Sequence, residues 1–332
     1  MTWLTWRQSR LESLIGGAAL ALVAVFMLWT GHTMIASYHD LGLPACVASH
    51  GGDGSCQNAV ADFLNRFGNL DGLVGWLNLL PFLLGLLLAT PTLLDLEQGT
   101  YRLAWTQSVT RRRWLAAKIG YGLVVAAVVS AALVALWSWW RGPFDAIDGR
   151  LNGNGFDLEG TVPFAYVVFS FAVCLAIGTV LRRTVPALGI GLVVYLVARL
   201  GVISQLRPHY LNPIKLTWDP TDPTPAAAVG RFGDGSWIID QGFSATGGRA
   251  TIDNALRDCA GVAGGGGEKR AIRLGADDAF NRCLHDHSIV NTLVYHPASR
   301  FWTFQGFETA LFLGVSAILL AVTVWWVLRR IA

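Results

Sequence analysis

The sequence predicts an all-α protein that crosses a membrane six times. Its 332 residues are 53% hydrophobic and only 14% charged, which is far from the composition of a soluble domain. Six apolar runs are each long enough to span a hydrocarbon core of about 30 Å. A polar stretch with two cysteines separates the last two runs, and this predicts a small disulfide-bonded insertion.

The six runs define the predicted spans. The first follows two arginines and has no small-residue cleavage site, so we expect it to be retained rather than removed as a signal peptide. The fifth contains one charge, Arg199. The spans are expected at residues 13–36, 73–94, 119–140, 161–181, 184–206 and 309–328.

Basic residues predict the orientation, because arginine and lysine in short loops face the cytoplasm. They gather before the first run, after the second, after the fourth and after the sixth. Since the chain changes side at each crossing, all of them fall on one face. We therefore expect a multi-pass plasma-membrane protein with both termini cytoplasmic. These residues are Arg7, Arg10, Arg102, Arg111, Arg112, Arg113, Lys118, Arg182, Arg183, Arg329 and Arg330.

The first twelve residues, MTWLTWRQSRLE, place Trp3, Trp6 and Arg7 at helical spacing. Aromatic and basic side chains on one face suit a short helix in the cytoplasmic membrane interface. A tail without fixed structure is the alternative. We expect Trp3, Trp6 and Arg7 to anchor the chain at the inner interface, together with Arg111, Arg112 and Arg113.

Cysteine positions agree with this topology. Two pairs fall in loops that the charge rule places outside, where disulfides persist. We expect bridges between Cys46 and Cys56 and between Cys259 and Cys283, although four cysteines allow three pairings. Cys174 lies within the fourth run and is expected to be a small core residue.

The predicted insertion covers residues 207–303. It begins with several prolines, continues with a strand-like and a helix-like segment, and is expected to be a small extracellular α+β domain. An aromatic segment follows, and residues 304–332 are expected to form a re-entrant or interfacial segment and the sixth span. Phe301, Trp302 and Phe304 could anchor the outer interface or, together with Arg199 and Glu308, line a pathway or form a gate.

Residues 95–113, which we call the coupling segment, interrupt the apolar sequence between the second and third spans. The segment begins with Asp95 and Glu97, turns at Gly99 and ends in three arginines. The arginines are typical of a segment held against the anionic inner leaflet. Two acids on a face dominated by cations indicate a contact with another protein.

The coupling segment resembles the corresponding part of ABC-2 type transporter permeases. The resemblance rests on an acid-x-acid-x-Gly-Thr element after span two and an arginine-rich entry to span three. The WRQSR and ASRFWTFQGFE segments are also similar to actinobacterial members of that group. The loop before span six departs from the family, in which it is a short helical hairpin. The matching residues are Asp95, Glu97, Gly99, Thr100, Val109, Thr110, Arg111, Arg113 and Trp114.

The resemblance implies that a coupling helix in this segment docks on a separate ABC ATPase subunit. Docking would involve Asp95, Glu97, Gly99, Thr100, Tyr101 and Arg102. The chain has no G-x-x-x-x-G-K-[ST] phosphate loop, so ATP and Mg are expected on the partner and no catalytic residue is expected here. The expected partners are the ATPase, a second permease copy or paralogue, and membrane lipids, but no nucleic acid.

Three other functions stay open. An ion-coupled carrier would need buried carboxylates, and no Asp or Glu lies within the six runs. Arg199 could pair with Glu308, contact a headgroup or, as we expect, extend outward along its span. A receptor or immunity protein would use only the insertion. An outer enzyme could use His285 and His287 beside Cys283, but a disulfide is expected there instead of a metal site. Apolar spans favour export of a hydrophobic or amphipathic substrate.

Overall fold

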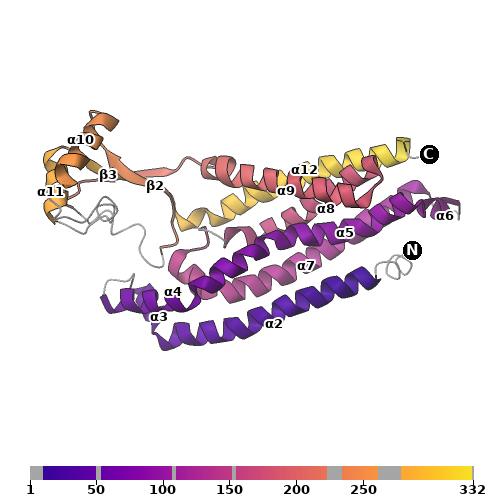
Figure 1. Ribbon diagram of the computed structural model, residues 1–332, viewed down its shortest axis with the longest axis horizontal. Coiled ribbons are helices and arrows are strands. Elements are labelled where there is room, and N and C mark those ends of the chain that lie inside the picture. Colours follow the sequence, from indigo (N-terminus) through magenta and orange to yellow (C-terminus); the bar gives the residue numbers. More distant parts are fainter. Residues whose placement is uncertain are drawn as a thin grey trace.

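The computed structural model describes residues 10–49, 54–106, 110–151, 155–222, 234–260 and 278–330. Six helical segments in this part of the chain are long and apolar enough to cross a membrane, as the sequence predicts. They form one elongated bundle (Figure 1). A small sheet lies at one end of the bundle. The start of α2 and the end of α12 lie at the opposite end, beside α6.

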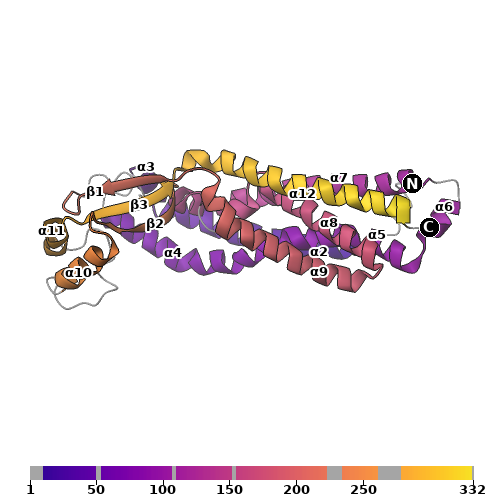
Figure 2. The same ribbon diagram turned by 90° about the horizontal axis from the view of Figure 1, so that it is seen from above.

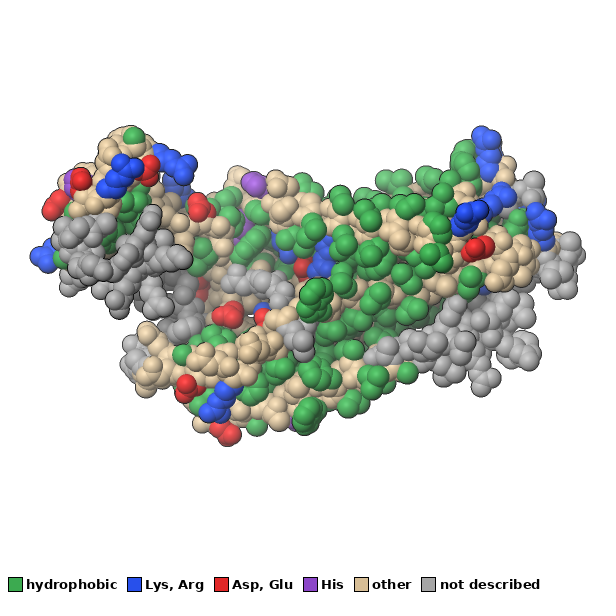
Figure 3. Space-filling model, viewed as in Figure 1, with side chains coloured by type: hydrophobic (Ala, Val, Ile, Leu, Met, Phe, Trp, Pro, Cys, Tyr) green, Lys and Arg blue, Asp and Glu red, His purple; other side chains and the backbone are tan. Residues whose placement is uncertain are grey.

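Each predicted span corresponds to one long helix. These helices consist almost entirely of apolar residues, and in Figure 3 hydrophobic side chains cover most of the visible face of the bundle. Lys and Arg side chains gather where α12 ends. The spans are α2 (Arg10–Asp40), α5 (Leu80–Gln98), α7 (Arg111–Asp148), α8 (Val162–Leu181), α9 (Thr184–Gly201) and α12 (Phe301–Arg330).

Helix α8 forms the centre of the bundle and is buried on all sides along most of its length. It packs mainly against α5, α9 and α12. Glycines on neighbouring helices allow the close approach. A Cβ at Gly85 of α5 would lie 2.6 Å from the Cβ of Ser170. A Cβ at Gly191 of α9 would lie 2.9 Å from the Sγ of Cys174, which is buried as expected of a core residue.

Helix α2 lies at the side of the bundle and packs on α7 (Figure 1). Gly31 faces the rings of Trp139 and Trp140, where a side chain would collide with them. The indole N–H of Trp140 donates to Thr30 Oγ1 at 3.0 Å, within this buried contact. A hydrogen bond satisfies the two polar groups that the contact removes from water.

Three helices extend beyond the predicted spans. Helix α7 continues through Arg141 and Asp145, whose ion pair of 2.9 Å holds one more helical turn. Helix α4 (Gly54–Val74) runs into α5 through the short turn η1 (Gly75–Leu79). Helix α12 is continuous from Phe301, so residues 304–308 are its first turns and not a separate re-entrant segment. A span predicted from hydropathy stops at the first charged residue, whereas the helix itself continues past that residue.

The insertion between α9 and α12 is a three-stranded antiparallel sheet with two helices (Figure 2). Its strands are β1 (Ile214–Trp218), β2 (Trp237–Ser244) and β3 (Val290–His296), in the order β1-β3-β2. Helices α10 (Arg249–Ala260) and α11 (Asp278–Asp286) share a small core around Leu284. The insertion is therefore α+β, as the sequence predicts.

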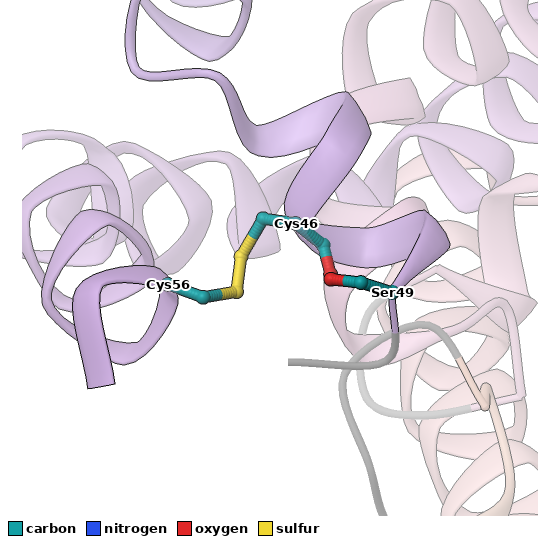
Figure 4. The surroundings of a disulfide bond; sticks show 3 residues. All are labelled: Cys46, Ser49 and Cys56. Carbon is teal, nitrogen blue, oxygen red and sulfur yellow. A yellow bond between two sulfur atoms is a disulfide. The ribbon is translucent and has the colours of Figure 1, made fainter. Parts of the chain in front are cut away.

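Both expected disulfides are present. Cys46 and Cys56 join α3 (Leu43–Ala48) to α4, with their Cα atoms 5.5 Å apart (Figure 4). Ser49 Oγ donates to the Cys46 carbonyl at 3.0 Å and caps this turn. Cys259 and Cys283 join α10 to α11, with Cα atoms 5.7 Å apart. The short elements that remain are α6 (Tyr101–Thr106), η2 (Phe156–Leu158), the π-helix η3 (Val202–Leu206), η4 (Arg207–His209) and η6 (Ala298–Arg300).

Candidate functional site

The coupling segment begins where α5 ends. Gly99 adopts a left-handed conformation, with φ of 73°, which stops α5 and turns the chain. The backbone N–H of Arg102 donates to the Gly99 carbonyl at 3.1 Å, and α6 starts there. On the far side of the segment, Thr110 caps α7 through a hydrogen bond from the Arg113 N–H. The segment therefore covers the end of the bundle opposite the sheet (Figure 1).

An aromatic cluster fixes α6 to two spans. The ring of Trp105 lies 4.5 Å from that of Tyr101 and 6.1 Å from that of Trp114 on α7. Val327 of α12 belongs to the same buried cluster. The Arg111 guanidinium lies 4.6 Å from the Trp105 ring, within reach of a cation–π contact. A force on α6 therefore acts directly on α7 and α12.

The two acids of the segment have partners within the chain. Asp95 forms an ion pair of 2.8 Å with Lys118 of α7 and accepts a hydrogen bond of 2.9 Å from the Thr100 hydroxyl. Glu97 Oε2 accepts a hydrogen bond of 2.8 Å from the backbone N–H of Thr184, the first residue of α9. These acids were expected to contact another protein, and the structure shows that they first hold α5 to α7 and α9.

The outward side of the segment is basic. Arg102, Arg112 and Arg113 are exposed, as is Gln98 at the end of α5. Tyr101 is buried, and Thr100 is half-buried. Glu97 is exposed as well, so the structure offers a partner the arginines and Glu97, whereas Asp95 is half-buried. Trp3, Trp6 and Arg7, the other expected anchors, lie outside the described residues.

A second polar site lies at the sheet end of the bundle. Four buried charged residues form what we call the ion-pair network: Asp157, Arg199, Arg207 and Glu308. Asp157 lies on η2, Glu308 on α12, and the two arginines follow each other along α9 and η4. In a regular α-helix, residues eight apart point about 80° away from each other. The wider π turn of η3 between the arginines reduces this angle, and both reach Asp157.

The contacts of the network satisfy both acids. Arg199 donates to Asp157 Oδ2 at 2.7 Å, and Arg207 donates to Asp157 Oδ1 at 2.5 Å. Arg207 also donates to both oxygens of Glu308, at 2.9 and 2.7 Å. The Tyr166 hydroxyl of α8 bonds to both acids. Two positive charges therefore face two negative charges.

Burial and pairing act in opposite directions on Asp157. Burial alone would raise the pKa of its carboxyl group, but the charges and hydrogen bonds of Arg207 and Arg199 outweigh this effect. The pKa of Asp157 consequently lies below its ordinary value, and the acid is ionised at neutral pH. Arg199 also donates to the side-chain and backbone oxygens of Asn78 on η1. The network thus joins the ends of α5, α8, α9 and α12.

The prediction that Arg199 extends outward is wrong. Its side chain is buried in the network, because Asp157 offers a closer counter-charge than water or a headgroup. Glu308 is fully buried and pairs with Arg207 rather than with Arg199. Hydropathy could not indicate Asp157, which lies in a loop 42 residues before Arg199. The one signal in the sequence was two arginines eight residues apart in an otherwise charge-free helix.

The expected gate residues split into two groups. Phe301 and Phe304 are buried, and Phe304 contacts the ring of His296 in β3 at 4.8 Å. Phe304 therefore connects α12 to the sheet, whereas Phe301 contacts Phe156 on η2 at 5.8 Å between ring centroids. Trp302 is 61% exposed and is free to lie in a membrane interface. His296 Nε2 donates to the Pro208 carbonyl at 3.1 Å, which links the sheet to η4.

Cys259, Cys283 and His287 place possible metal ligands within 4.8 Å of one another. The two sulfur atoms are bonded to each other, so neither is a thiolate. Cysteine binds a metal through its thiolate, so in its oxidised form this group leaves only His287 as a ligand and does not fit a metal. His285 instead lies 2.6 Å from Asp219, as an ion pair or hydrogen bond at the surface.

Comparison with known families identifies the family of the chain. The family model described as ABC-2 membrane transporter related matches residues 17–207, more than half of the chain. The chain belongs to this family. It is an ABC-2 type permease, and such permeases generally associate with ABC ATPase subunits. No curated protein and no solved structure matches the chain.

The part that matches the ABC-2 family contains the coupling segment and three members of the ion-pair network, Asp157, Arg199 and Arg207. Glu308 and the sheet lie beyond it. The network therefore joins the family's own helices to the part of the chain that follows them.

Proposed function

We propose that the chain is the membrane-spanning subunit of an ATP-driven exporter and works with a separate ABC ATPase. The observation that carries this proposal is the coupling segment, an exposed basic surface built on a short helix that packs directly on two spans. A partner that pushes on α6 would move α7 and α12 through Trp105, Trp114 and Val327. ATP and Mg would bind the partner, and this chain would not hydrolyse ATP by itself.

The proposed orientation places the coupling segment and both termini in the cytoplasm and the disulfide-bonded insertion outside. The basic residues at the α6 end support this orientation through the positive-inside rule. The disulfides at the opposite end support it through the oxidising exterior. The chain would act together with a second permease copy or a paralogue.

A hydrophobic or amphipathic substrate fits the apolar composition of the spans. An ion-coupled carrier is less consistent with the ion-pair network, because its two carboxylates are already bound by arginines. A carboxylate that transports an ion has to exchange that ion for another partner. Asp157 and Glu308 are instead held from two or more sides.

Affinity purification from native membranes tests the proposal. We expect an ABC ATPase to co-purify with the wild-type chain in a fixed ratio. The double variant Arg102→Glu/Arg112→Glu reverses the charge of the exposed surface and should lose this partner. Arg330→Glu changes an exposed arginine at the same end, outside the segment, and should retain it. Absence of any ATPase from the wild-type preparation would refute the proposal.

A further inference from the structure

Helix α9 connects the two polar sites. At one end, the backbone N–H of Thr184 binds the Glu97 carboxylate. At the other end, Arg199 binds Asp157. Fifteen residues separate Thr184 from Arg199, which corresponds to roughly 22 Å of helix. Polar contacts thus hold the same rigid element at both ends.

Between these ends, α9 contacts the bundle along one narrow stripe. The stripe contains Ala187, Gly191 and Tyr195, which are buried against α8 and α5. The opposite side is apolar and exposed, as at Val193 and Val197. Tyr195 is fully buried and packs against three aromatic rings of α5 and α8, so the end of α9 near Arg199 is fixed to the core. Ala187 and Gly191 contact the bundle through small side chains only, so the first half of α9 can separate from α8 with a smaller loss of packing.

The ion-pair network makes the outer end of α9 a two-state contact. If Arg199 leaves Asp157, the network loses one positive charge from a buried group of four. An uncompensated buried charge is strongly unfavourable, so a gradual loosening is not stable. The contact between Arg199 and Asp157 is therefore either fully formed or fully exchanged for another partner. Such an element can convert a small displacement into a discrete change.

We propose that α9 transmits the movement of the coupling segment to the ion-pair network, with Glu97 as the positioning residue at one end and Arg199 at the other. This inference rests on the proposed function. Glu97 is exposed, but in this view it acts through α9 rather than through a contact with the ATPase. It ties the end of α5 to the start of α9, so that a push on the segment pulls on Arg199.

Labelling of the Cys174 thiol measures the movement of α9. The other four cysteines of the chain are in disulfides, so Cys174 carries the single free thiol. It is buried in α8, directly beneath Gly191 of α9. A small, uncharged, membrane-permeant maleimide reaches it only if α9 moves away from α8. The experiment follows its labelling in the reconstituted permease–ATPase complex, with and without ATP.

In the wild type we expect ATP to change the labelling rate of Cys174. In Glu97→Ala this change should shrink severalfold, because the variant loses the hydrogen bond that joins the end of α5 to the start of α9. Glu97→Gln keeps an acceptor oxygen for Thr184 and should restore most of the response. Gln98→Ala, an exposed neighbour, is the matched control. ATPase co-purification should be unchanged in all three variants.

Asp157→Asn tests the other end. It weakens the contact with Arg199 and should raise labelling in the absence of ATP. Three outcomes would each overturn the inference. The first is unchanged labelling in Asp157→Asn, the second is a full ATP response in Glu97→Ala, and the third is no labelling of the wild type with or without ATP. Failure to recover an ATPase with the wild type would instead refute the proposed function. Gel filtration of each variant shows that it is folded.

Discussion

The carboxylate of Glu97, at the end of α5, lies 2.8 Å from the backbone nitrogen of Thr184, which is 87 positions further along the chain. An acid at this place does two things at once. It satisfies one of the free N–H groups at the start of α9, and its charge is favourable beside the positive end of the helix dipole. The residue that best matches the family motif is therefore also part of the fold.

Replacement of Arg207 should destabilise the protein severely. Arg207→Met leaves Glu308 without its ion-pair partner in a fully buried position, and we expect a loss of about 3–5 kcal/mol. The double variant Arg207→Met/Glu308→Gln removes both charges and should recover much of this loss. Thermal unfolding in one detergent compares the two. A double variant as unstable as the single one would show that the charge is not the cause.

The network should be insensitive to pH in the neutral range. Burial tends to raise the pKa of Asp157, but Arg207 and Arg199 hold it below the ordinary value of about 3.9. A lowered folded-state pKa gives stability that is complete above the unfolded-state pKa and is lost as pH falls below it. The melting temperature should therefore not respond to Asp157 between about pH 5 and 8. Asp157→Asn should flatten the decline measured below this range.

The junction between the sheet and the bundle should respond to mild acid. Burial lowers the pKa of His296, and the nearby charge of Arg300 also lowers it, against the hydrogen bond to Pro208. The neutral ring accepts a hydrogen bond of 2.7 Å from Arg300, so protonation would place two cations together. The stability that the neutral His296 ring gives to the junction is complete above the unfolded-state pKa of about 6.5, and it is lost as pH falls below that value.

Proteolysis of the insertion between about pH 7.5 and 5.5 measures this effect, since the window is set by the ordinary histidine pKa. The wild type should become more susceptible at the lower pH. His296→Gln keeps a side chain that can bond to Pro208 but does not titrate there, so its susceptibility should not change with pH. Equal acid sensitivity in both proteins would assign the effect to another group.

Removal of the disulfide in the insertion should cost about 3 kcal/mol, because the bridge closes a loop between positions 24 residues apart. The double variant Cys259→Ser/Cys283→Ser should unfold its insertion at lower denaturant concentration. Hydrogen exchange of the peptides that contain α10 and α11, followed by mass spectrometry, would report the change separately from the bundle. The spans should retain their helical circular dichroism, since the bridge does not reach them.

The sequence predicted the features that depend on local composition. Six apolar runs gave six helices, and loop cysteines paired within their own loops. Hydropathy failed where a charged residue continues a helix. Arg141 ended the predicted third span, but its pair with Asp145 four positions later extends α7 to Asp148.

The partners of the site residues could not be predicted, because they are distant in sequence. Asp157 and Glu308 reach Arg207 only after α8, α9 and α12 are packed together. The periodicity of apolar residues predicts which side of a helix is buried, but it does not predict which charged residue lies near the end of that helix. Arg199 was therefore expected to turn toward solvent, the default for an isolated cation in a span.

The buried position of α8 has a consequence for biosynthesis. A nascent chain that has inserted only its first four spans lacks α9 and α12, which cover α8 in the complete protein. Asp157, just before α8, then has neither Arg199 nor Arg207 beside it, and Tyr166 lacks Glu308. A truncated chain would present the unpaired charge of Asp157 at the end of this helix. An unfinished copy of the chain therefore differs chemically from a complete one beside α8.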